Sequence, residues 1–424
     1  MGRTREVALT AKGICDAQRI ELYPGPDLEH AATRSAEAAD ALARLMPPNA
    51  RFSVQAPALR DLLNVNWADW WPGSSVVTGT ERVSGETMRI RFRGRLRAVD
   101  FIARHILGTD EFEHIPEAGA GHADVLVVDH PVLERLLPRA RTAMAVPAWL
   151  RQSSALGAEW SETLRAFPAS LRKEVSRLLR REPYIAQIDA AERAKQDYYE
   201  NLYVPYLTRR FGSSAVLRSR RAFDREARGG VLLELRLGAE LLGGAILRRD
   251  ANGGLAIVNS ALPVGKARAG QSDLLDYFSF LTAQLLGCKF VDFGVSRPHL
   301  DDGVLRYKAK WRSRISPVGG LDKLIRIVPL RASAATLGFL GRNGFIERHG
   351  ERFIVRRLYA DRLSDRAERM RLGSLAARVG VDAVILAPPN ALVMSDDLSA
   401  LPSHVELRQT RPDAEPVAAF LALE

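Results

Sequence analysis

The chain has few cysteines, few lysines and no long apolar run, and each shortage excludes a class of protein. Its two cysteines, Cys15 and Cys288, lie 273 positions apart. Two thiols exclude a disulfide framework and a four-thiolate zinc site, and their separation excludes a Cys-x-x-Cys redox motif. No window approaches 18 consecutive apolar residues, so the sequence predicts no transmembrane helix.

Targeting signals are also missing from the first residues. The stretch from Met1 to Lys12 lacks the apolar core of a signal peptide. Glu6 stands where the myristoylation pattern that begins at Gly2 requires Ser or Thr. We therefore expect a cytoplasmic protein.

The composition is that of an ordinary globular protein with a basic excess. The 424 residues are 46% apolar and 26% charged, which excludes disordered and fibrous classes. At about 150 residues per domain, this length suggests two or three domains. The net charge of +11 favours anionic partners. Eight of the 61 basic residues are lysines, which leaves 53 arginines, so two lysines close together are informative.

Several catalytic signatures are absent or stand in the wrong context. Asp292-Phe-Gly294 matches the metal-binding triplet of protein kinases, but no His-Arg-Asp motif precedes it. The histidines form no His-Glu-x-x-His pair, and there is neither a Walker loop nor a Gly-x-Ser-x-Gly elbow. Gly119-Ala-Gly121 precedes a strand instead of following one, which argues against a dinucleotide fingerprint. Kinases, simple hydrolases and Rossmann dehydrogenases are therefore disfavoured.

The middle of the chain has an α+β pattern. Three strands are predicted, at residues 231–237, 241–247 and 255–261, with turn signals between them. Ser272 is the expected N-cap of a helix that runs to Leu286, with Gly287 as the residue after its C-cap, and residues 289–293 form the next strand. Three antiparallel strands, a helix and a further strand are typical of an α+β domain.

Other elements are predicted from apolar periodicity. Trp67, Trp70 and Trp71 could form a platform for sugars or bases, but core packing is favoured. The expected strands are 20–23, 87–92, 124–129 and 382–387, and the expected helices are 36–45, 98–107, 171–181, 190–210 and 361–379.

One pair of segments resembles a known family. Phe290-Val-Asp-Phe-Gly-Val-Ser-Arg297 followed by Asp302-Gly-Val-Leu-Arg-Tyr-Lys-Ala-Lys-Trp311 is similar to the end of the second acyltransferase unit in the FemAB and BioF2-like (CelD-like) group of the GNAT superfamily. The Arg-rich helix 171–181, Leu202-Tyr-Val-Pro-Tyr206 with Arg209, and Gly243-Gly244 also look like pieces of that family. The resemblance extends over residues 146–330.

The resemblance implies a fold and a domain division. The fold would be α+β, with a GNAT-like mixed, mostly antiparallel sheet flanked by helices. Residues 146–330 would form the acyltransferase domain, and residues 331–424 a C-terminal α/β extension. Residues 1–145 would be an N-terminal α/β region, which duplication in the family suggests as a second, degenerate GNAT unit.

The resemblance also implies a binding loop for the donor. A typical GNAT holds the pyrophosphate of CoA on Arg/Gln-x-x-Gly-x-Gly/Ala, and the corresponding stretch here is Gly265-Lys-Ala-Arg-Ala-Gly-Gln-Ser272. Ala267 stands where the family has Arg or Gln. A Gly-containing turn that enters a helix still offers N–H groups and a positive dipole end to a phosphate. The predicted donor-binding residues are Lys266, Arg268, Gly270, Gln271 and Ser272.

Lys308 is the leading catalytic candidate. It belongs to Tyr307-Lys-Ala-Lys-Trp311, where two of the eight lysines lie within three residues. A compact ammonium differs from a guanidinium beside a developing oxyanion, and the family's corresponding lysine acts in the transfer step. Alternation alone equally predicts a strand with Lys308 and Lys310 on its solvated face and Tyr307, Ala309 and Trp311 packed inside. We assign function to Lys308 and the solvated face to Lys310.

Further candidates lie close to these segments. Asp292 faces either a cleft or a buried partner, and Ser296 and Arg297 follow the strand, where open sheets bind ligands. His299 is a candidate general base, although an isolated loop histidine is usually solvated. The predicted catalytic residues are Lys308, Asp292, Ser296 and Tyr307, and the predicted substrate-binding residues are Arg297, Tyr206 and Arg209.

The expected function is N-acyl transfer from acyl-CoA, without a metal, to a small-molecule or a glycan- or lipid-linked amine. Aminoacyl transfer from charged tRNA is the first alternative, which the Arg-rich helix and the net charge would suit. The second alternative is a catalytically degenerate scaffold that binds a partner.

Overall fold

The computed structural model describes most of the chain between residues 143 and 358 and shorter stretches outside it. The described residues are 19–22, 36–47, 73–81, 84–94, 113–115, 121–129, 143–212, 215, 217–265, 268–318, 324–358, 366–387 and 405–407. The predicted helix 98–107, Lys266 and the three tryptophans Trp67, Trp70 and Trp71 lie outside them. The chain divides into two compact units, the first formed by residues 1–54, 152–294 and 310–313 and the second by 55–151, 295–309 and 314–424.

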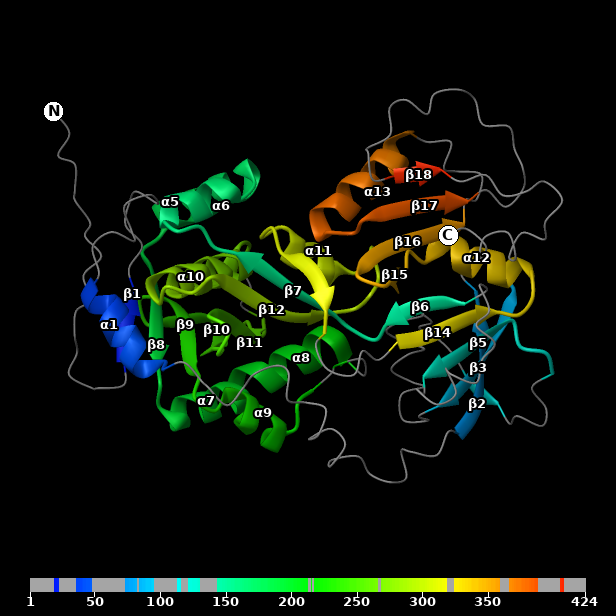
Figure 1. The fold of residues 1–424 in the computed structure, drawn as a ribbon. Coiled ribbons are helices and arrows are strands. Elements are labelled where there is room, and N and C mark those ends of the chain that lie inside the picture. The colour runs from blue at the N-terminus through cyan, green and yellow to red at the C-terminus, as the bar shows by residue number, and fades with distance from the viewer. Residues whose placement is uncertain are drawn as a thin grey trace. The chain divides into compact units, whose positions relative to one another are not determined.

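The first unit is built on a mixed sheet. Its strands follow the order β1-β8-β9-β10-β11-β12-β7 (Figure 1). The registers from β1 to β11 are antiparallel, whereas β11 and β12 are parallel. The strand bounds are β1 (Arg19–Leu22), β7 (Leu150–Ala155), β8 (Tyr184–Asp189), β9 (Val231–Leu237), β10 (Glu240–Arg249), β11 (Gly254–Ala261) and β12 (Phe290–Ser296).

Helices cover both faces of this sheet. On β10, Ala245 belongs to the core cluster formed with α1, α5, α6 and α10, and the next residue, Ile246, belongs to the cluster formed with α7, η5 and α9. Figure 1 shows α7, α8 and α9 along one side of the strands. The bounds are α1 (Ala36–Leu45), α5 (Trp160–Ala166), α6 (Ala169–Arg181), α7 (Glu192–Tyr198), the π-helix η5 (Tyr199–Tyr203), α8 (Val204–Phe211), α9 (Arg220–Ala227) and α10 (Gln271–Leu285).

The second unit contains a six-stranded sheet and a four-stranded sheet. The six strands follow the order β4-β2-β3-β5-β14-β6, and the four follow β15-β16-β17-β18. The strand bounds are β2 (Gly73–Thr80), β3 (Thr87–Gly94), β4 (Glu113–Ile115), β5 (Val125–Asp129), β6 (Met144–Pro147), β13 (Arg314–Pro317), β14 (Leu324–Pro329), β15 (Ile346–His349), β16 (Arg352–Leu358), β17 (Ala383–Ala387) and β18 (Val405–Leu407). The helices are α11 (Gly303–Ala309), α12 (Ala334–Arg342) and α13 (Arg366–Val379).

The structure confirms an α+β fold with mostly antiparallel sheets flanked by helices. The predicted run of three strands, a helix and a strand is β9, β10, β11, α10 and β12, and Gly287 follows α10 with a φ of +65°. The helix expected at 190–210 is confirmed as the contiguous helices α7, η5 and α8, of which η5 is a π-helix. The alternative strand at 307–311 is wrong, because these residues form the end of α11 followed by a turn.

Candidate functional site

The parallel pair β11–β12, joined by α10, is the part of the first unit best suited to bind a ligand. The register pairs Gly254 with Phe290, Leu255 with Val291 and Ala256 with Asp292, and then ends, although both strands continue. Because α10 connects two parallel strands, its N-terminus follows the carboxyl end of β11. In open sheets with parallel strands, ligands bind at this end of the strands.

The first turn of α10 differs from the prediction at its cap. Gly270, not Ser272, is the N-cap residue, and Ser272 lies inside the helix. Gly270 has a φ of +86°, and a Cβ there would lie 2.4 Å from a methyl carbon of Leu178 on α6. Glycine is therefore required twice, by the left-handed backbone and by the close approach of α6. The turn is closed by Gln271, whose buried side-chain Oε1 accepts from the Arg268 N–H at 2.9 Å.

Two ion pairs flank this helix start. The Arg268 guanidinium lies 2.6 Å from a Glu240 carboxylate oxygen, and both side chains are partly exposed. The Lys310 ammonium lies 2.6 Å from Oδ2 of Asp273, whose other oxygen is buried without a hydrogen bond to any described residue. These contacts correct the prediction for Lys310, which lies in a turn and holds a buried carboxylate instead of facing solvent from a strand.

The residues of this helix start fit a phosphate group. The N–H groups in the first turn of a helix have no partner within the helix, and the helix dipole favours negative charge there. Ser272 adds a half-buried hydroxyl, and Arg268 adds a cation whose partner Glu240 is itself partly exposed. The buried Asp273 carboxylate is neutralised by Lys310. Of the predicted donor-binding residues, Arg268, Gly270, Gln271 and Ser272 therefore lie together.

The predicted substrate-binding residues Tyr206 and Arg209 lie on α8, among the helices on the opposite face of the sheet from α10. Tyr206 accepts a hydrogen bond from Arg210, whose guanidinium also lies over its ring, 5.6 Å from the centroid. Arg209 is exposed. The structure does not bring these two side chains to the first turn of α10.

Sequence reasoning missed a polar pair between α7 and β11. The Tyr198 hydroxyl lies 2.8 Å from Oδ1 of Asn259, and burial raises the pKa of this phenol well above its usual value, so it stays a donor. The Asn259 Nδ2 atom is buried and makes no hydrogen bond to the described part of the chain. Asn259 lies beyond the last β11–β12 pair. A signal was present in the sequence, because an Asn inside the apolar strand 255–261 needs a partner.

Strand β12 carries Asp292 and Ser296, both almost completely buried. The Asp292 Oδ1 atom accepts from the Gly294 N–H at 2.9 Å, and Gly294 has a φ of +70°. The side chain of Asp292 thus holds the backbone of Gly294 just beyond the last residue pair of β11 and β12. It is a buried carboxylate with a backbone partner, which was one of the two interpretations of the sequence.

In the second unit, α11 carries Tyr307 and Lys308. Lys308 is 9% exposed, and its ammonium donates to the carbonyl oxygen of Val295 at 2.8 Å. The helix begins where Oδ1 of Asp302 accepts from the Leu305 N–H, and Oδ2 of Asp302 lies 4.0 Å from Arg297. The predicted residues Ser296, Arg297, Tyr307 and Lys308 thus belong to one segment, from the end of β12 to α11.

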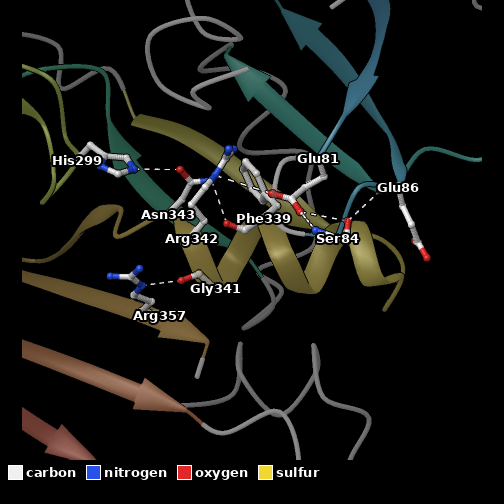
Figure 2. A network of polar contacts seen from close by, with 9 residues as sticks. All are labelled: Glu81, Ser84, Glu86, His299, Phe339, Gly341, Arg342, Asn343 and Arg357. Atoms are coloured by element: carbon white, nitrogen blue, oxygen red, sulfur yellow. Dashed lines mark hydrogen bonds and ion pairs between the residues drawn. The ribbon is translucent and has the colours of Figure 1, made fainter. Parts of the chain in front are cut away.

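His299 is fixed by hydrogen bonds and is not a solvated base. Its Nε2 lies 3.0 Å from Oδ1 of Asn343 at the end of α12 (Figure 2). Its Nδ1 accepts from the Asp301 N–H. The Asn343 amide also donates to the Phe339 carbonyl oxygen. Burial lowers the pKa of His299, against opposing contributions from Asn343 and from the Asp301 and Asp302 carboxylates. The ring is therefore neutral near pH 7, with Nε2 as the donor.

No family model and no curated protein match the chain. Among solved structures, it is similar to L-PGS from Bacillus licheniformis, with 12% identity over 71% of this chain and 94% of that chain and a TM-score of 0.32. It is similar to FemX, with 14% identity, coverage of 69% and 96% and a TM-score of 0.32. A GCN5-related N-acetyltransferase from Sphaerobacter thermophilus has 10% identity, coverage of 76% and 98% and a TM-score of 0.29. All three TM-scores lie below 0.5, so the proposed function depends on the residues of this chain.

Two kinds of feature are absent from the described residues. None of their helices is long and apolar enough to cross a membrane. Within the same residues, no group of three or more His, Cys, Asp or Glu side chains could hold a metal ion.

Proposed function

We propose that this chain is an acyltransferase that moves an acyl group from acyl-CoA to an amine. The observation that carries the proposal is the β11–α10–β12 arrangement, in which a parallel register ends early beside a glycine-capped helix start. Such a helix start binds phosphate through its N–H groups. The motif resemblance of residues 290–311 to FemAB and BioF2-like proteins supports acyl transfer as the reaction.

The donor in this proposal is anchored by its phosphates. The N–H groups of the first turn of α10, the Ser272 hydroxyl and the Arg268 guanidinium would hold the pyrophosphate, and Lys266 of the same loop adds a further cation. Glu240 competes with the phosphates for Arg268 because its carboxylate lies 2.6 Å away. CoA would supply the activated thioester.

The transfer step needs an acceptor for a proton and a stabiliser for an oxyanion. The amine nitrogen attacks the thioester carbonyl, the C–S bond breaks, and the thiolate of CoA takes up a proton. Asp292 is the proposed proton acceptor. The resemblance of residues 290–311 makes Lys308 the candidate for stabilising an oxyanion, with Tyr307 and Ser296 as candidate hydrogen-bond donors. Arg297 is proposed to bind the acceptor substrate, whereas Tyr206 and Arg209, on the opposite face of the sheet from α10, are not part of this proposal.

One observation favours charged tRNA as a second candidate donor. Helix α6 buries Leu171, Val175 and Leu178 and carries basic residues on its other face. In the described part of the chain, Arg172, Lys173 and Arg181 form no ion pair with a carboxylate, whereas Arg177 pairs with Glu174. A basic helix face of this kind suits a polyanion.

The experiment is calorimetric titration of the full chain with acetyl-CoA, combined with an assay of thiol release in the presence of amines. We expect Arg268→Ala and Ser272→Ala to weaken binding by about tenfold each, because each removes a hydrogen bond to a charged group. Glu240→Gln should tighten binding, since it frees Arg268. Arg225→Ala is the matched control, because Arg225 is an exposed arginine on α9 of the same unit.

The outcomes separate the candidate donors. Saturable binding of acetyl-CoA that is weakened by Arg268→Ala and tightened by Glu240→Gln supports acyl-CoA as the donor. Binding of charged tRNA with a slope of about −0.7 to −0.9 per neutralised phosphate in log affinity against log salt, weakened by Arg172→Ala, would support the second candidate instead. Binding of CoA without thiol release for any amine would indicate the scaffold alternative.

A further inference from the structure

The polar pair at the end of β11 has hydrogen-bonding capacity that the described chain leaves unused. The Tyr198 hydroxyl lies 2.8 Å from Oδ1 of Asn259 and 3.4 Å from the Gly244 carbonyl oxygen. The Nδ2 atom of Asn259 is buried and makes no hydrogen bond to the residues that the structure describes. A buried donor without an acceptor destabilises a fold, so its presence needs a reason.

A β-bulge turns Asn259 toward Tyr198. Ile257 packs in the core cluster on the α10 side of the sheet, and strict alternation along β11 would place Asn259 on that side as well. The register with β10 instead shifts, because Ile246 pairs with Asn259 and the next residue of β10 pairs with Ile257. Val258 is the extra residue, and it packs with Tyr198 in the cluster on the other face. Bulges re-aim side chains in this way and are over-represented next to active sites.

Two further features of the backbone surround Tyr198. A Cβ at Gly244 would lie 2.9 Å from the Tyr198 ring, so glycine is needed on β10 for the ring to pack there. Helix α7 ends at Tyr198, and the π-helix η5 follows directly. π-Helices are rare and occur frequently at functional sites. The bulge, the glycine and the π-helix therefore meet at one polar pair.

The pair lies where the parallel pairing of β11 with β12 has stopped. Asn259 comes three residues after Ala256, the last residue of β11 in that register. Asn259 is half-buried and the next residue, Ser260, is exposed, so the amide lies close to the surface. Unlike Tyr206 and Arg209 on the same face, Asn259 belongs to the strand pair of the proposed acyltransferase site.

The surroundings of the pair favour a neutral ligand group. The Nδ2 atom can only donate, so the group that it binds must offer an acceptor such as a carbonyl oxygen. Leu202 and Ile246, which pack in the same cluster as Tyr198, are apolar. Among the described residues, no cation forms a hydrogen bond with Asn259. A carboxylate there would be a charge without a counter-ion, whereas a carbonyl oxygen is neutral.

We propose that Asn259, held by Tyr198, is a specificity residue for the acyl acceptor and donates from Nδ2 to a neutral carbonyl oxygen beside the acceptor's amine. The acceptor class is then an amine that carries an amide or ester carbonyl, such as an amino-acid amide, and not a simple alkylamine. This inference rests on the proposed acyl transfer and adds the chemistry of the acceptor. The phosphates of the donor would bind at α10, on the other face of the sheet, so the two substrates do not compete for one place.

The test measures thiol release from acetyl-CoA by the full chain with two amines, glycinamide and propylamine. Asn259→Leu combined with Tyr198→Phe replaces both members of the pair by apolar side chains of similar shape. We expect kcat/KM for glycinamide to fall about tenfold through a higher KM, because one hydrogen bond to the substrate is lost. The value for propylamine should not change. The melting temperature should stay the same or rise, since the unpaired donor is gone.

Tyr199→Phe is the matched control. Tyr199 is the neighbouring tyrosine, and its hydroxyl donates to the Arg218 carbonyl oxygen instead. This variant should leave the ratio of the two kcat/KM values unchanged. Tyr198→Phe alone removes a single hydroxyl and should show the selective loss to a smaller extent, which keeps the test valid if the double variant unfolds more readily.

Two results would overturn the inference and leave acyl transfer in place. One is an equal fold-change in kcat/KM for both amines in Tyr198→Phe, and the other is no change for either amine in the double variant. If the wild-type chain released no thiol from acetyl-CoA with any amine, the proposed function would fail, and the inference about the acceptor with it.

Discussion

Lys308 and Lys310 lie two positions apart, and the structure gives them different tasks. The Lys308 ammonium donates to the Val295 carbonyl oxygen at the end of β12, in the second unit. The Lys310 ammonium neutralises Asp273 at the start of α10, in the first unit. Both tasks use a compact ammonium at the end of a flexible stem, which accounts for lysine at these positions in a chain that otherwise uses arginine.

Replacing Lys308 tests its proposed role in the reaction. If its charge stabilises the transition state, Lys308→Ala should lower kcat and kcat/KM together, by roughly 10²-fold or about 3 kcal/mol. Lys308→Arg should restore little activity. Lys289→Ala, at an exposed lysine, is the control. Full activity of Lys308→Met with an unchanged melting temperature would rule out a role for this charge.

Replacing Lys310 tests the ion pair at α10. Lys310→Ala should destabilise the chain by about 1–2 kcal/mol, because it leaves the buried Asp273 without its counter-ion while half-exposure of Lys310 limits the loss. Asp273→Asn should then reverse most of the effect of Lys310→Ala. Denaturant unfolding of the two single variants and the double variant measures the coupling. Purely additive losses would mean that the pair contributes nothing.

His299 should make stability depend on pH. Burial lowers its pKa from the ordinary 6.5, against the raising influence of Asn343, Asp301 and Asp302. As pH falls below about 6.5, His299 takes up a proton in the unfolded chain before it does so in the folded chain. The contribution of His299 to the free energy of unfolding is therefore complete above pH 6.5 and is lost between pH 6.5 and the pKa of the folded state. Denaturant unfolding at several values between pH 5 and 8 should show this loss in wild type and not in His299→Gln. His122→Gln, at an exposed histidine, is the control. An identical dependence of the unfolding free energy on pH in wild type and in His299→Gln would contradict this prediction.

At the scale of elements, the start of α10 shows what the sequence predicts and what it does not. The helix, the strands on either side of it and Gly287 after its end follow from periodicity and turn residues. The cap was predicted at Ser272, because Ser is a good N-cap residue and Gly270 looks like part of a loop. The contact between Gly270 and Leu178 of α6 decides the cap instead, and no local pattern contains it.

Two glycines of the same loop separate backbone strain from packing. Gly270 and Gly265 have φ values of +86° and +80°, but a Cβ at Gly265 would meet nothing within 4 Å. Gly265→Ala should therefore cost about 1 kcal/mol of folding free energy, from the left-handed backbone. Gly270→Ala should cost clearly more and should weaken acetyl-CoA binding, because Leu178 must move. If thermal unfolding showed the same loss of folding free energy for Gly265→Ala and Gly270→Ala, the contact of Gly270 with α6 would be unimportant.

At the scale of the whole molecule, the chain passes between its two units several times. Residues 310–313 belong to the first unit, although the residues on either side belong to the second. Trp311 is fully buried there and stacks on Phe280 at 5.3 Å, as its apolar character predicts. The interleaving itself could not be predicted, because a sequence pattern records which residues are buried and not which core receives them. For the same reason, Tyr206 and Arg209 could be placed on a helix but not on a face of the sheet.

The central claim, that an acyl donor binds at the start of α10, is tested most directly by hydrogen–deuterium exchange with and without acetyl-CoA. We predict that acetyl-CoA slows exchange of the amides at residues 272–273, because their N–H groups would then donate to phosphate oxygens, whereas the N–H groups of Gln271 and Leu274 already donate to the carbonyl oxygens of Arg268 and Gly270. The protection should be smaller in Arg268→Ala and unchanged in Arg225→Ala. Unaltered exchange at residues 272–273 under conditions where calorimetry shows that acetyl-CoA is bound would contradict the account.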